Sequence, residues 1–290
     1  MGGRVGERAG AVRFNAKNPM PELPEVETTV RGLARYLDGA LIARAETRRA
    51  NLRRPFPPDL VQVLTRATVT GLTRRAKYGL IHTDRAQTLV FHLGMSGRWR
   101  IDPAELGKHD HLVLETGAGH VLALCDPRRF GSVDLVETAT LDLWPPFAAL
   151  GPEPLGPGLT APHLRAVLAG RVAGIKLMLL DQRIVAGLGN IYVCEALFRA
   201  GIDPRKAAGA VSMPALKRLV PAIRGVLEEA IAAGGSTLRD YAQPSGELGY
   251  FAKQFDVYGR EGAPCGCGGI VVRIVQGGRS TWFCPKCQKG

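Results

Sequence analysis

The sequence predicts an α+β protein with an N-terminal helix and an antiparallel β-sandwich first, a helical module second and a cysteine-bearing β-hairpin last. Three observations lead to this fold class. Apolar residues recur at helical spacing near the start and again beyond residue 180, short strand-like runs lie between these regions, and four of the six cysteines fall in the last 26 residues. A chain of 290 residues that is 46% hydrophobic is long enough for roughly two domains with cores of their own.

The first predicted element is a helix over residues 24–37. Pro24 suits a first helical turn, and the acidic Glu25 suits the positive N-terminal end of a helix. The apolar positions that recur at helical spacing are Val26, Val30, Leu33 and Leu37. Residues 1–19 are rich in Gly, Arg and Ala and lack periodicity, so we expect a disordered or non-native extension there.

Six short runs of strand-forming residues follow this helix, and turn residues bound each run. The predicted strands cover residues 79–83, 88–93, 98–101, 111–115, 120–124 and 132–136. This pattern favours an antiparallel sandwich, which we place within residues 20–150. Proline and glycine then become frequent, and residues 151–158 are the predicted linker.

The next predicted domain, residues 159–255, is helical. A long helix is expected between Pro214 and Gly234, and the internal Pro221 should kink it. Its apolar stripe consists of Leu216, Leu219, Val220, Ile223, Leu227 and Ile231.

A further helix is expected within residues 180–202, after a glycine-rich turn. Asn190 can provide its N-cap and Gly201 can end it. The turn before this helix either presents backbone amides to a phosphate or serves ordinary helix packing, and the segment favours neither reading.

Residues 256–290 are predicted to form a hairpin domain. The runs at 271–275 and 280–284 alternate as strands around a Gly-Gly turn, which is a strong hairpin signal. Arg279 therefore lies near the hairpin tip, where a guanidinium can reach a DNA phosphate or simply be a solvated turn residue.

The cysteines of this hairpin domain have the spacing of zinc ligands, with sixteen residues between two close pairs. The four candidate ligands are Cys265, Cys267, Cys284 and Cys287. One structural Zn²⁺ is favoured over free thiols or disulfides, because no secretion signal is present. The first pair is C-x-C where C-x-x-C is usual for zinc ribbons, a change that can strain or weaken the site. Cys125 and Cys194 have no such partners and are predicted core residues.

The chain is strongly basic, with 38 Lys and Arg against 26 Asp and Glu and a net charge of +12. Residues 1–20 hold four basic residues and one acidic residue, so most of this charge belongs to the remainder. A pI near 9.8 indicates a polyanionic partner, most commonly nucleic acid. No apolar run is long enough for a membrane span or a secretion signal, so we expect a cytoplasmic protein with no membrane partner.

The octet MPELPEVE at residues 20–27 can carry chemistry. An internal proline nitrogen is an unreactive amide, whereas a terminal Pro21 would be a secondary amine able to form a Schiff base. Glu22 and Glu25 place carboxyl groups directly behind it. Capping of the predicted helix explains the same residues without any catalysis.

The chain contains, in this order, MPELPEVET, RRAKYGL, HLGMSGRWR, KHDH, DPRRFG, LGPEPL, GLGNIYVCEALFRAGI, GGSTLRDY, GYF, VYGREG and GGRST followed by FCPKCQ. These eleven blocks resemble the bacterial formamidopyrimidine-DNA glycosylases, and the likeness extends from Pro21 to Lys289. The extension at residues 1–19 and the shortened Cys265–Cys267 pair depart from the family pattern.

The resemblance implies a helix-two-turn-helix module in the helical domain and a bifunctional enzyme that excises oxidised purines and then cuts the strand. In that scheme a terminal Pro21 attacks the damaged nucleotide and Glu22 donates a proton. Lys77 matches the family lysine of β-elimination, and Arg279 matches the arginine of δ-elimination. Lys77 by itself could equally be a phosphate contact.

The resemblance also implies a monomer that binds double-stranded DNA containing oxidised bases, in the bacterial nucleoid. Phosphate contacts fall on His109, Arg128, Arg171 and Asn190. Met95, Arg128 and Phe130 match the residues that fill the gap left by an extruded base, although a lone Met or Phe is more often a core residue. The segment 234–241 matches the loop that closes over the lesion.

Two alternatives remain open. A sister family excises oxidised pyrimidines and shares the N-terminal proline, although PELPEVE and DPRRF match the purine-acting family better. If residues 1–19 stay attached, Pro21 is an amide, and the chain would be a catalytically silent zinc-ribbon DNA-binding protein.

Overall fold

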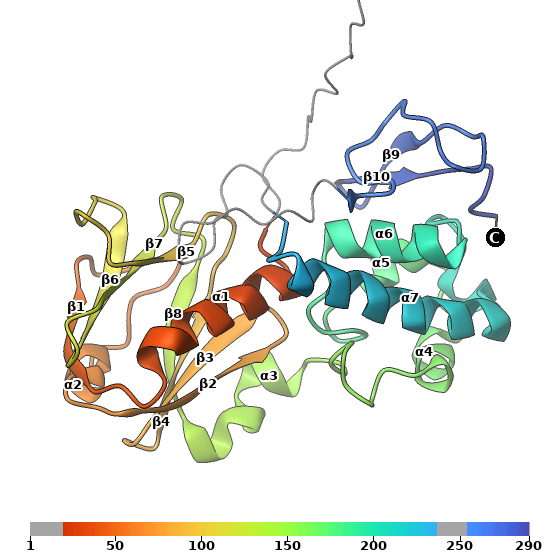
Figure 1. Cartoon of the computed structure of the whole chain (residues 1–290). Coiled ribbons are helices and arrows are strands. Elements are labelled where there is room, and N and C mark those ends of the chain that lie inside the picture. Colours follow the sequence, from red (N-terminus) through yellow and green to blue (C-terminus); the bar gives the residue numbers. More distant parts are fainter. Residues whose placement is uncertain (1–19, 237–253, 290) are drawn as a thin grey trace, which may run out of the picture.

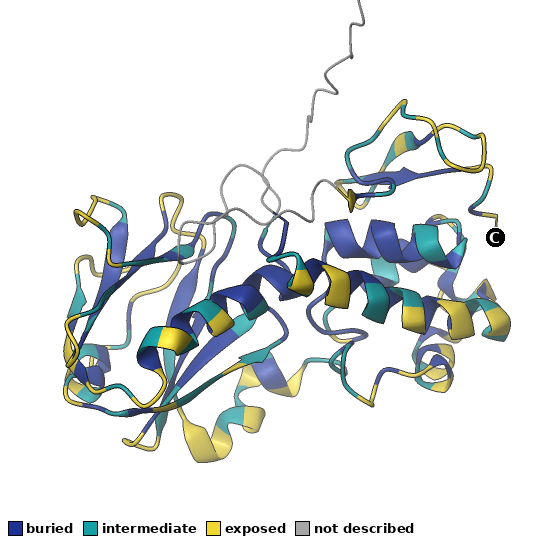
Figure 2. Ribbon diagram, in the orientation of Figure 1, coloured by how far each residue is buried: buried dark blue, intermediate teal, exposed yellow. Residues whose placement is uncertain are grey.

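The computed structural model describes residues 20–236 and 254–289. A β-sandwich forms one half of the molecule, helices form the other half, and a small hairpin packs against the helices (Figure 1). Helix α1 (Leu23–Leu37) extends from the sandwich to the helical half, and buried residues run along its inner side (Figure 2). Its first residue, Leu23, belongs to the helical core, while Val26 and Val30 belong to the sandwich core. One helix therefore contributes to both hydrophobic cores.

The sandwich consists of two four-stranded antiparallel sheets. One sheet has the order β1 (Ile42–Thr47), β6 (Asp110–Thr116), β7 (Val121–Cys125) and β5 (Arg98–Ile101). The other has the order β2 (Val69–Arg75), β3 (Tyr78–Thr83), β4 (Gln87–His92) and β8 (Ser132–Glu137). The Phe91 and Trp99 rings, one from each sheet region, meet edge to face with centroids 5.6 Å apart in the core.

The predicted sandwich and its six strands are confirmed, but the two strands β1 and β2 and the short helix α2 (Leu60–Leu64) were not predicted. Strand β1 carries five polar or small residues in six positions, and β2 contains Gly71 at a register shift. Both strands therefore lack the regular apolar alternation that identifies a strand from sequence. Their places in the sheets depend on long-range pairing.

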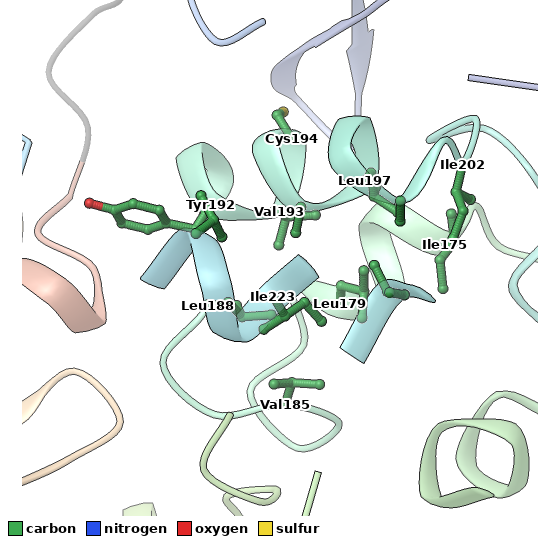
Figure 3. Close-up of a cluster of buried hydrophobic side chains, with 14 of the residues drawn as sticks. Ile175, Leu179, Val185, Leu188, Tyr192, Val193, Cys194, Leu197, Ile202 and Ile223 are labelled. Carbon is green, nitrogen blue, oxygen red and sulfur yellow. The ribbon is translucent and has the colours of Figure 1, made fainter. Parts of the chain in front are cut away.

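The helical half comprises short helices packed around two longer ones. They are η1 (Thr138–Leu143) and α3 (Pro145–Ala148) at the sandwich boundary, then α4 (Ala161–Leu168), α5 (Ile175–Leu179), α6 (Asn190–Ala200), η2 (Ala208–Ala210) and α7 (Met213–Ala232). Residues 151–158, the predicted linker, contain no helix or strand. Leu188, Val193 and Ile223 lie within one buried apolar cluster between α6, α7 and the turn before α6 (Figure 3).

Helix α7 carries the predicted apolar stripe. The helix continues through Pro221, which is exposed to solvent. Gly201 ends α6 in the left-handed conformation with φ +68°, as predicted. The predicted N-cap is wrong, because Gly189 is the capping residue and Asn190 is the first residue of the helix. The side-chain amide of Asn190 instead donates a hydrogen bond to the backbone carbonyl of Ser280 at 2.9 Å.

The C-terminal hairpin pairs β9 (Val272–Gln276) with β10 (Arg279–Phe283). Gly277 and Gly278 form the two-residue turn with φ +54° and +73°, values that favour glycine at both positions. Arg279 begins β10 beside this turn, so the predicted hairpin and the position of Arg279 are confirmed. In the described residues no helix has both the length and the apolar character needed to cross a membrane.

A buried carboxylate attaches the segment before the hairpin to helix α6. Glu195 is 0% exposed and accepts hydrogen bonds from the backbone N–H groups of Asp256, Val257 and Tyr258 at 2.8, 3.0 and 2.8 Å. The Tyr258 ring then packs on Trp282 of β10 with centroids 4.4 Å apart. This carboxylate therefore fixes the start of the hairpin domain on the helical half.

We expect Glu195→Ala to lower the free energy of unfolding by about 3 kcal/mol, because three buried donors lose their acceptor. Thermal or urea denaturation measures the change. Glu228→Ala, on the exposed side of α7, is the control and should leave stability nearly unchanged. Equal stability of both variants would contradict an anchoring role for Glu195.

Candidate active site and zinc centre

The first residues of α1 meet the first turn of α6. The Glu22 carboxylate accepts hydrogen bonds from the backbone N–H groups of Ile191 at 2.9 Å and Tyr192 at 3.4 Å. A Cβ atom on Gly189 would lie 2.3 Å from the Glu22 carboxyl carbon, so only glycine allows this approach. The positive end of α6 favours the carboxylate. The glycine-rich turn therefore allows helix packing against Glu22, which occupies the amides of Ile191 and Tyr192.

Glu22 is 2% exposed, and its environment changes its acidity. Burial raises the pKa of Glu22 from 4.5 to about 7, against the opposing effects of Lys77 and the Ile191 and Tyr192 amides. Glu25 adds to the increase. A carboxyl group with this pKa is partly protonated near neutrality and can donate a proton.

Lys77 interacts electrostatically with Glu22, and each group affects the pKa of the other. It is 8% exposed, and burial lowers its pKa, with Glu22 opposing and Arg279 reinforcing the decrease. The structure thus brings together three of the predicted catalytic residues, and the buried Pro21 directly precedes Glu22. Residues from the N-terminal helix, a sandwich hairpin and the C-terminal hairpin converge on one site.

Glu25 connects three segments of the site. One carboxylate oxygen accepts the backbone N–H of Glu22 at 2.9 Å, which completes a capping box. The other accepts the Tyr192 hydroxyl at 2.6 Å and both the N–H and the hydroxyl of Ser236 at 2.8 Å. Ser236 lies in the predicted lesion loop 234–241, of which residues 237–241 lie outside the described part of the chain. Glu25 therefore links the start of α1 to α6 and to the root of that loop.

Lys77 occupies the second position of a two-residue turn between β2 and β3. The turn is closed by the pair Arg75 and Tyr78, and Ala76 adopts φ +52°. For an L-residue with a Cβ atom this left-handed conformation costs roughly 1–2 kcal/mol. Neighbouring contacts must therefore hold the turn in place.

Arg279 is positioned by groups on the helical half. The Ser280 carbonyl, next along the chain, accepts hydrogen bonds from Asn190 at 2.9 Å and from the Lys176 ammonium at 2.9 Å. Lys176 is 0% exposed and also donates to the Thr281 hydroxyl at 2.7 Å. Lys176 was not predicted, although a lysine inside the apolar run of α5 could have indicated a buried partner.

Met95 and Phe130 lie on two loops that approach backbone to backbone. A Cβ atom on Gly94 would lie 2.4 Å from the Phe130 carbonyl carbon, and Gly94 has φ +62°. The Arg128 guanidinium stacks over the Phe130 ring, 4.8 Å from its centroid. Phe130 is 45% exposed, so the alternative that it is a core residue is wrong.

A buried aspartate joins these two loops. Asp126 accepts the Ser96 hydroxyl at 2.6 Å with one oxygen and the Gly131 N–H at 2.8 Å with the other. Its own N–H donates to the His109 carbonyl at 2.9 Å, which places His109 at the base of the same loops. Sequence reasoning missed Asp126, because its partners are 5 to 30 residues away in the chain.

Arg171 belongs to the helical half of the molecule. It is exposed in the loop between α4 and α5, and its carbonyl accepts the Gly209 N–H at 2.9 Å. No hydrogen bond from its guanidinium exists within residues 20–236 and 254–289. A role in phosphate binding stays a prediction for this residue.

The four cysteine thiols converge at the base of the C-terminal hairpin. Their sulfur atoms all lie within 4.8 Å of one another, with Cys265 to Cys287 at 3.8 Å and Cys267 to Cys284 at 3.5 Å. Four thiolates at about 2.3 Å from a tetrahedral zinc ion would be about 3.8 Å apart. The geometry fits one structural zinc, and the shortened C-x-C pair still reaches the common centre. Cys125 and Cys194 are buried away from this centre, as predicted.

Three family models match consecutive parts of the chain. They are the formamidopyrimidine-DNA glycosylase N-terminal domain over residues 20–133, the formamidopyrimidine-DNA glycosylase H2TH domain over 150–242, and a zinc finger found in FPG and IleRS over 267–290. The sandwich, the helical module and the zinc-binding hairpin together define a zinc-containing DNA glycosylase. Cys265 lies just outside the matched zinc finger, which agrees with the unusual first pair.

Relatives that match over their full length carry the same family name. A formamidopyrimidine-DNA glycosylase of Novosphingobium aromaticivorans is 74% identical over 93% of this chain and 100% of its own length. The protein of the same name from Rhizorhabdus wittichii is 70% identical with the same coverage. The crystal structure of MutM (FPG) from Thermus thermophilus is 39% identical, with a TM-score of 0.83 over 92% of this chain and 98% of that one.

The chain belongs to the formamidopyrimidine-DNA glycosylase family. It is therefore an enzyme of base-excision repair, with the glycosylase and lyase activities general to that family. A structure of Lactococcus lactis FPG in complex with DNA containing Fapy-dG is 35% identical, with a TM-score of 0.85 over 93% of this chain and 100% of that one.

The raised pKa of Glu22 predicts a pH dependence of stability in the 290-residue chain. Between about pH 4.5 and 7 the folded chain holds a proton that the unfolded chain releases, so stability falls as pH rises. The slope from one such group is at most about 1.4 kcal/mol per pH unit. Denaturation at several pH values should show that Glu22→Gln removes this component, whereas Glu228→Gln keeps it.

We expect about one zinc ion per chain, removable by a strong chelator. Cys265→Ser should lower the bound zinc measured by metal analysis, because one of four thiolates is lost. Cys125→Ser is the control and should keep the metal. Unchanged zinc content and affinity in Cys265→Ser would exclude Cys265 as a ligand.

Proposed function

We propose that this enzyme excises oxidised purines, 8-oxoguanine and formamidopyrimidines, from double-stranded DNA through a Schiff base on Pro21. The observation that carries the proposal is the buried carboxyl of Glu22, which directly follows Pro21 and interacts electrostatically with Lys77. Support comes from the names of the full-length relatives and from the Fapy-dG in the DNA bound to Lactococcus lactis FPG.

In the proposed first step the neutral amine of a terminal Pro21 attacks the anomeric carbon of the damaged nucleotide. An α-amino group has a reference pKa of about 7.7–8.0, so a useful fraction is neutral near pH 7. The bond to the base breaks, and the Glu22 carboxyl donates its proton to the sugar ring oxygen or to the departing base. The amine proton goes to the other of these two groups, and the bond between the anomeric carbon and the ring oxygen breaks as the nitrogen lone pair forms the C=N bond of the iminium.

Strand cleavage follows from the iminium. We assign the β-elimination to Lys77, whose burial lowers its pKa and increases the neutral fraction that can accept a proton. The sugar carbon next to the iminium gives up that proton, and the 3′ phosphate leaves. Arg279 is assigned to the following δ-elimination, in which the 5′ phosphate leaves.

DNA binding is assigned to residues around this site. Met95, Arg128 and Phe130 occupy two fixed loops and would enter the base stack, which offsets part of the cost of extruding a base. His109, Arg171 and Asn190 are proposed phosphate contacts. We also propose that the enzyme acts as a monomer, in the cytoplasm and on the bacterial nucleoid.

Catalysis by Pro21 requires that it is the first residue of the active enzyme. We propose that Met20 is the initiator and is removed. The N-terminal family match begins at residue 20, and 93% of this chain covers the full length of the relatives. Protein that keeps residues 1–19 would bind DNA without forming a Schiff base.

The test compares protein produced from Met1 with protein produced from Met20. Each is incubated with duplexes containing 8-oxoguanine or an oxidised pyrimidine, and borohydride then traps any Schiff base. We expect a covalent cross-link to the 8-oxoguanine duplex only when Pro21 is terminal. DNA binding, measured by gel mobility shift, should be similar for both proteins and serves as the control.

Other outcomes would change the assignment. A cross-link formed by untrimmed Met1 protein would exclude Pro21 as the nucleophile, and its absence from both proteins despite DNA binding would overturn the Schiff-base mechanism. A preference for the pyrimidine lesion would favour the second candidate function. A Lactococcus lactis FPG structure with DNA containing an oxidized pyrimidine makes that outcome worth measuring.

A further inference from the structure

The turn that carries Lys77 is held by a carboxylate from the linker between the two halves of the molecule. Glu153 accepts the backbone N–H of Ala76 at 2.6 Å and the Arg75 guanidinium at 2.7 Å with one oxygen. Its other oxygen accepts the Arg74 guanidinium at 2.8 Å. Three consecutive residues before Lys77 therefore bind a single side chain.

Arg74 completes the attachment of the turn. Its Nη1 amino group donates to the Ala76 carbonyl at 2.9 Å as well as to Glu153, so the N–H and the carbonyl of Ala76 both have partners. Its Nε donates to Glu27 of α1 at 2.9 Å. The Arg74 side chain is only 9% exposed. The left-handed conformation of Ala76 is thus fixed from the linker and from the helix that begins next to Glu22.

Glu153 itself is fixed by the helical half. The preceding Gly151 donates its N–H to the Gln182 carbonyl at 2.8 Å, and the Pro152 carbonyl accepts the Ala186 N–H at 3.1 Å. The Arg75 guanidinium also donates to the Gly151 carbonyl at 2.8 Å. A short chain of contacts therefore runs from the turn before α6, through the linker, to the turn that carries Lys77.

This chain of contacts parallels the one made by Glu22. Glu22 binds the first turn of α6, and Glu153 is held by the segment that leads into α6. Glu22 and the turn that carries Lys77 are therefore held by the same part of the helical half. Displacement of a catalytic group by about 1 Å can cost up to about a hundredfold in rate.

We propose that Glu153 is a positioning residue that fixes Lys77 for proton abstraction, an inference that rests on the proposed role of Lys77. Burial alone would raise the pKa of Glu153, but Arg74, the Ala76 amide and Arg75 together lower it. Glu153 therefore remains a carboxylate at neutral pH and keeps its three donors. It acts through the turn and contacts no reacting atom.

The test uses protein beginning at Pro21 and a duplex with one abasic site, which separates two steps in single-turnover reactions. Borohydride trapping measures Schiff-base formation, and gel analysis without borohydride measures strand cleavage. The variants are Glu153→Ala, Glu153→Gln and Lys77→Ala. Glu229→Gln is the matched control, because Glu229 also binds an arginine with both oxygens, at 2.8 Å to Arg199 in the helical half.

We expect Glu153→Ala to slow strand cleavage about tenfold or more while trapping changes by less than about twofold. Glu153→Gln should fall between Glu153→Ala and the unchanged protein, because an amide oxygen can still accept the Ala76 N–H. The pH midpoint of cleavage should rise in both variants as Lys77 becomes more hydrated. Glu229→Gln should change none of these quantities.

Two results would overturn the inference while leaving the function of Lys77 intact. One is an unchanged ratio of cleavage to trapping in the Glu153 variants when Lys77→Ala lowers that ratio. The other is an equal loss of trapping and cleavage with an unchanged pH midpoint, which would indicate a general structural role. If Lys77→Ala itself keeps the full ratio, the proposed role of Lys77 fails and the inference fails with it. Should Glu153→Ala not fold, the Glu153→Gln variant decides the same comparison.

Discussion

The hydrogen bonds between the Glu22 carboxylate and the first turn of α6 are the constraint on which the rest of the site depends. They join the start of the sandwich domain to the helical half. They also give partners to the Ile191 and Tyr192 N–H groups, which have none within the helix itself. Gly189 is required because any side chain there would overlap the carboxyl group. Leu23, the residue after Glu22, packs in the helical core. Polar contacts of Glu22 and apolar contacts of Leu23 therefore fix the start of α1 together. The residue before Glu22 can therefore take only a narrow range of positions.

The same contact sets the chemistry of the carboxyl group. Burial would raise the pKa of Glu22 further without Lys77 and the Ile191 and Tyr192 amides, whereas an exposed Glu22 would be ionised at neutral pH. The balance of these effects gives Glu22 a pKa of about 7, where both protonation states are accessible. Stability is lost in keeping such a group inside the protein, as is common where function requires buried polar residues. The charge of Glu25 adds to that cost, while its hydrogen bonds fix the Glu22 backbone next to Tyr192 and Ser236.

The elements with strong local patterns could be predicted from the sequence, and those that depend on distant partners could not. The stripe of α7 and the Gly277–Gly278 turn follow directly from local periodicity and turn chemistry. The capping of α6 was mispredicted because its partner, Glu22, lies 169 residues earlier in the chain. The family resemblance suggested the residues to which the reaction is assigned, but it did not predict the groups that hold them. Lys176 and Asp126 act through bonds across 104 and 30 residues, which leave no local pattern.

Buried carboxylates in this basic protein serve the backbone as much as they serve cations. Within the described residues, Glu195 and Asp126 bind backbone N–H groups and no guanidinium, whereas the partly exposed Glu153 binds an N–H group together with two arginines. Arg128 stacks on Phe130, and no salt bridge joins it to a carboxylate within residues 20–236 and 254–289. The loop is thus fixed by Asp126, while the Arg128 guanidinium stays available for the DNA contact proposed for it.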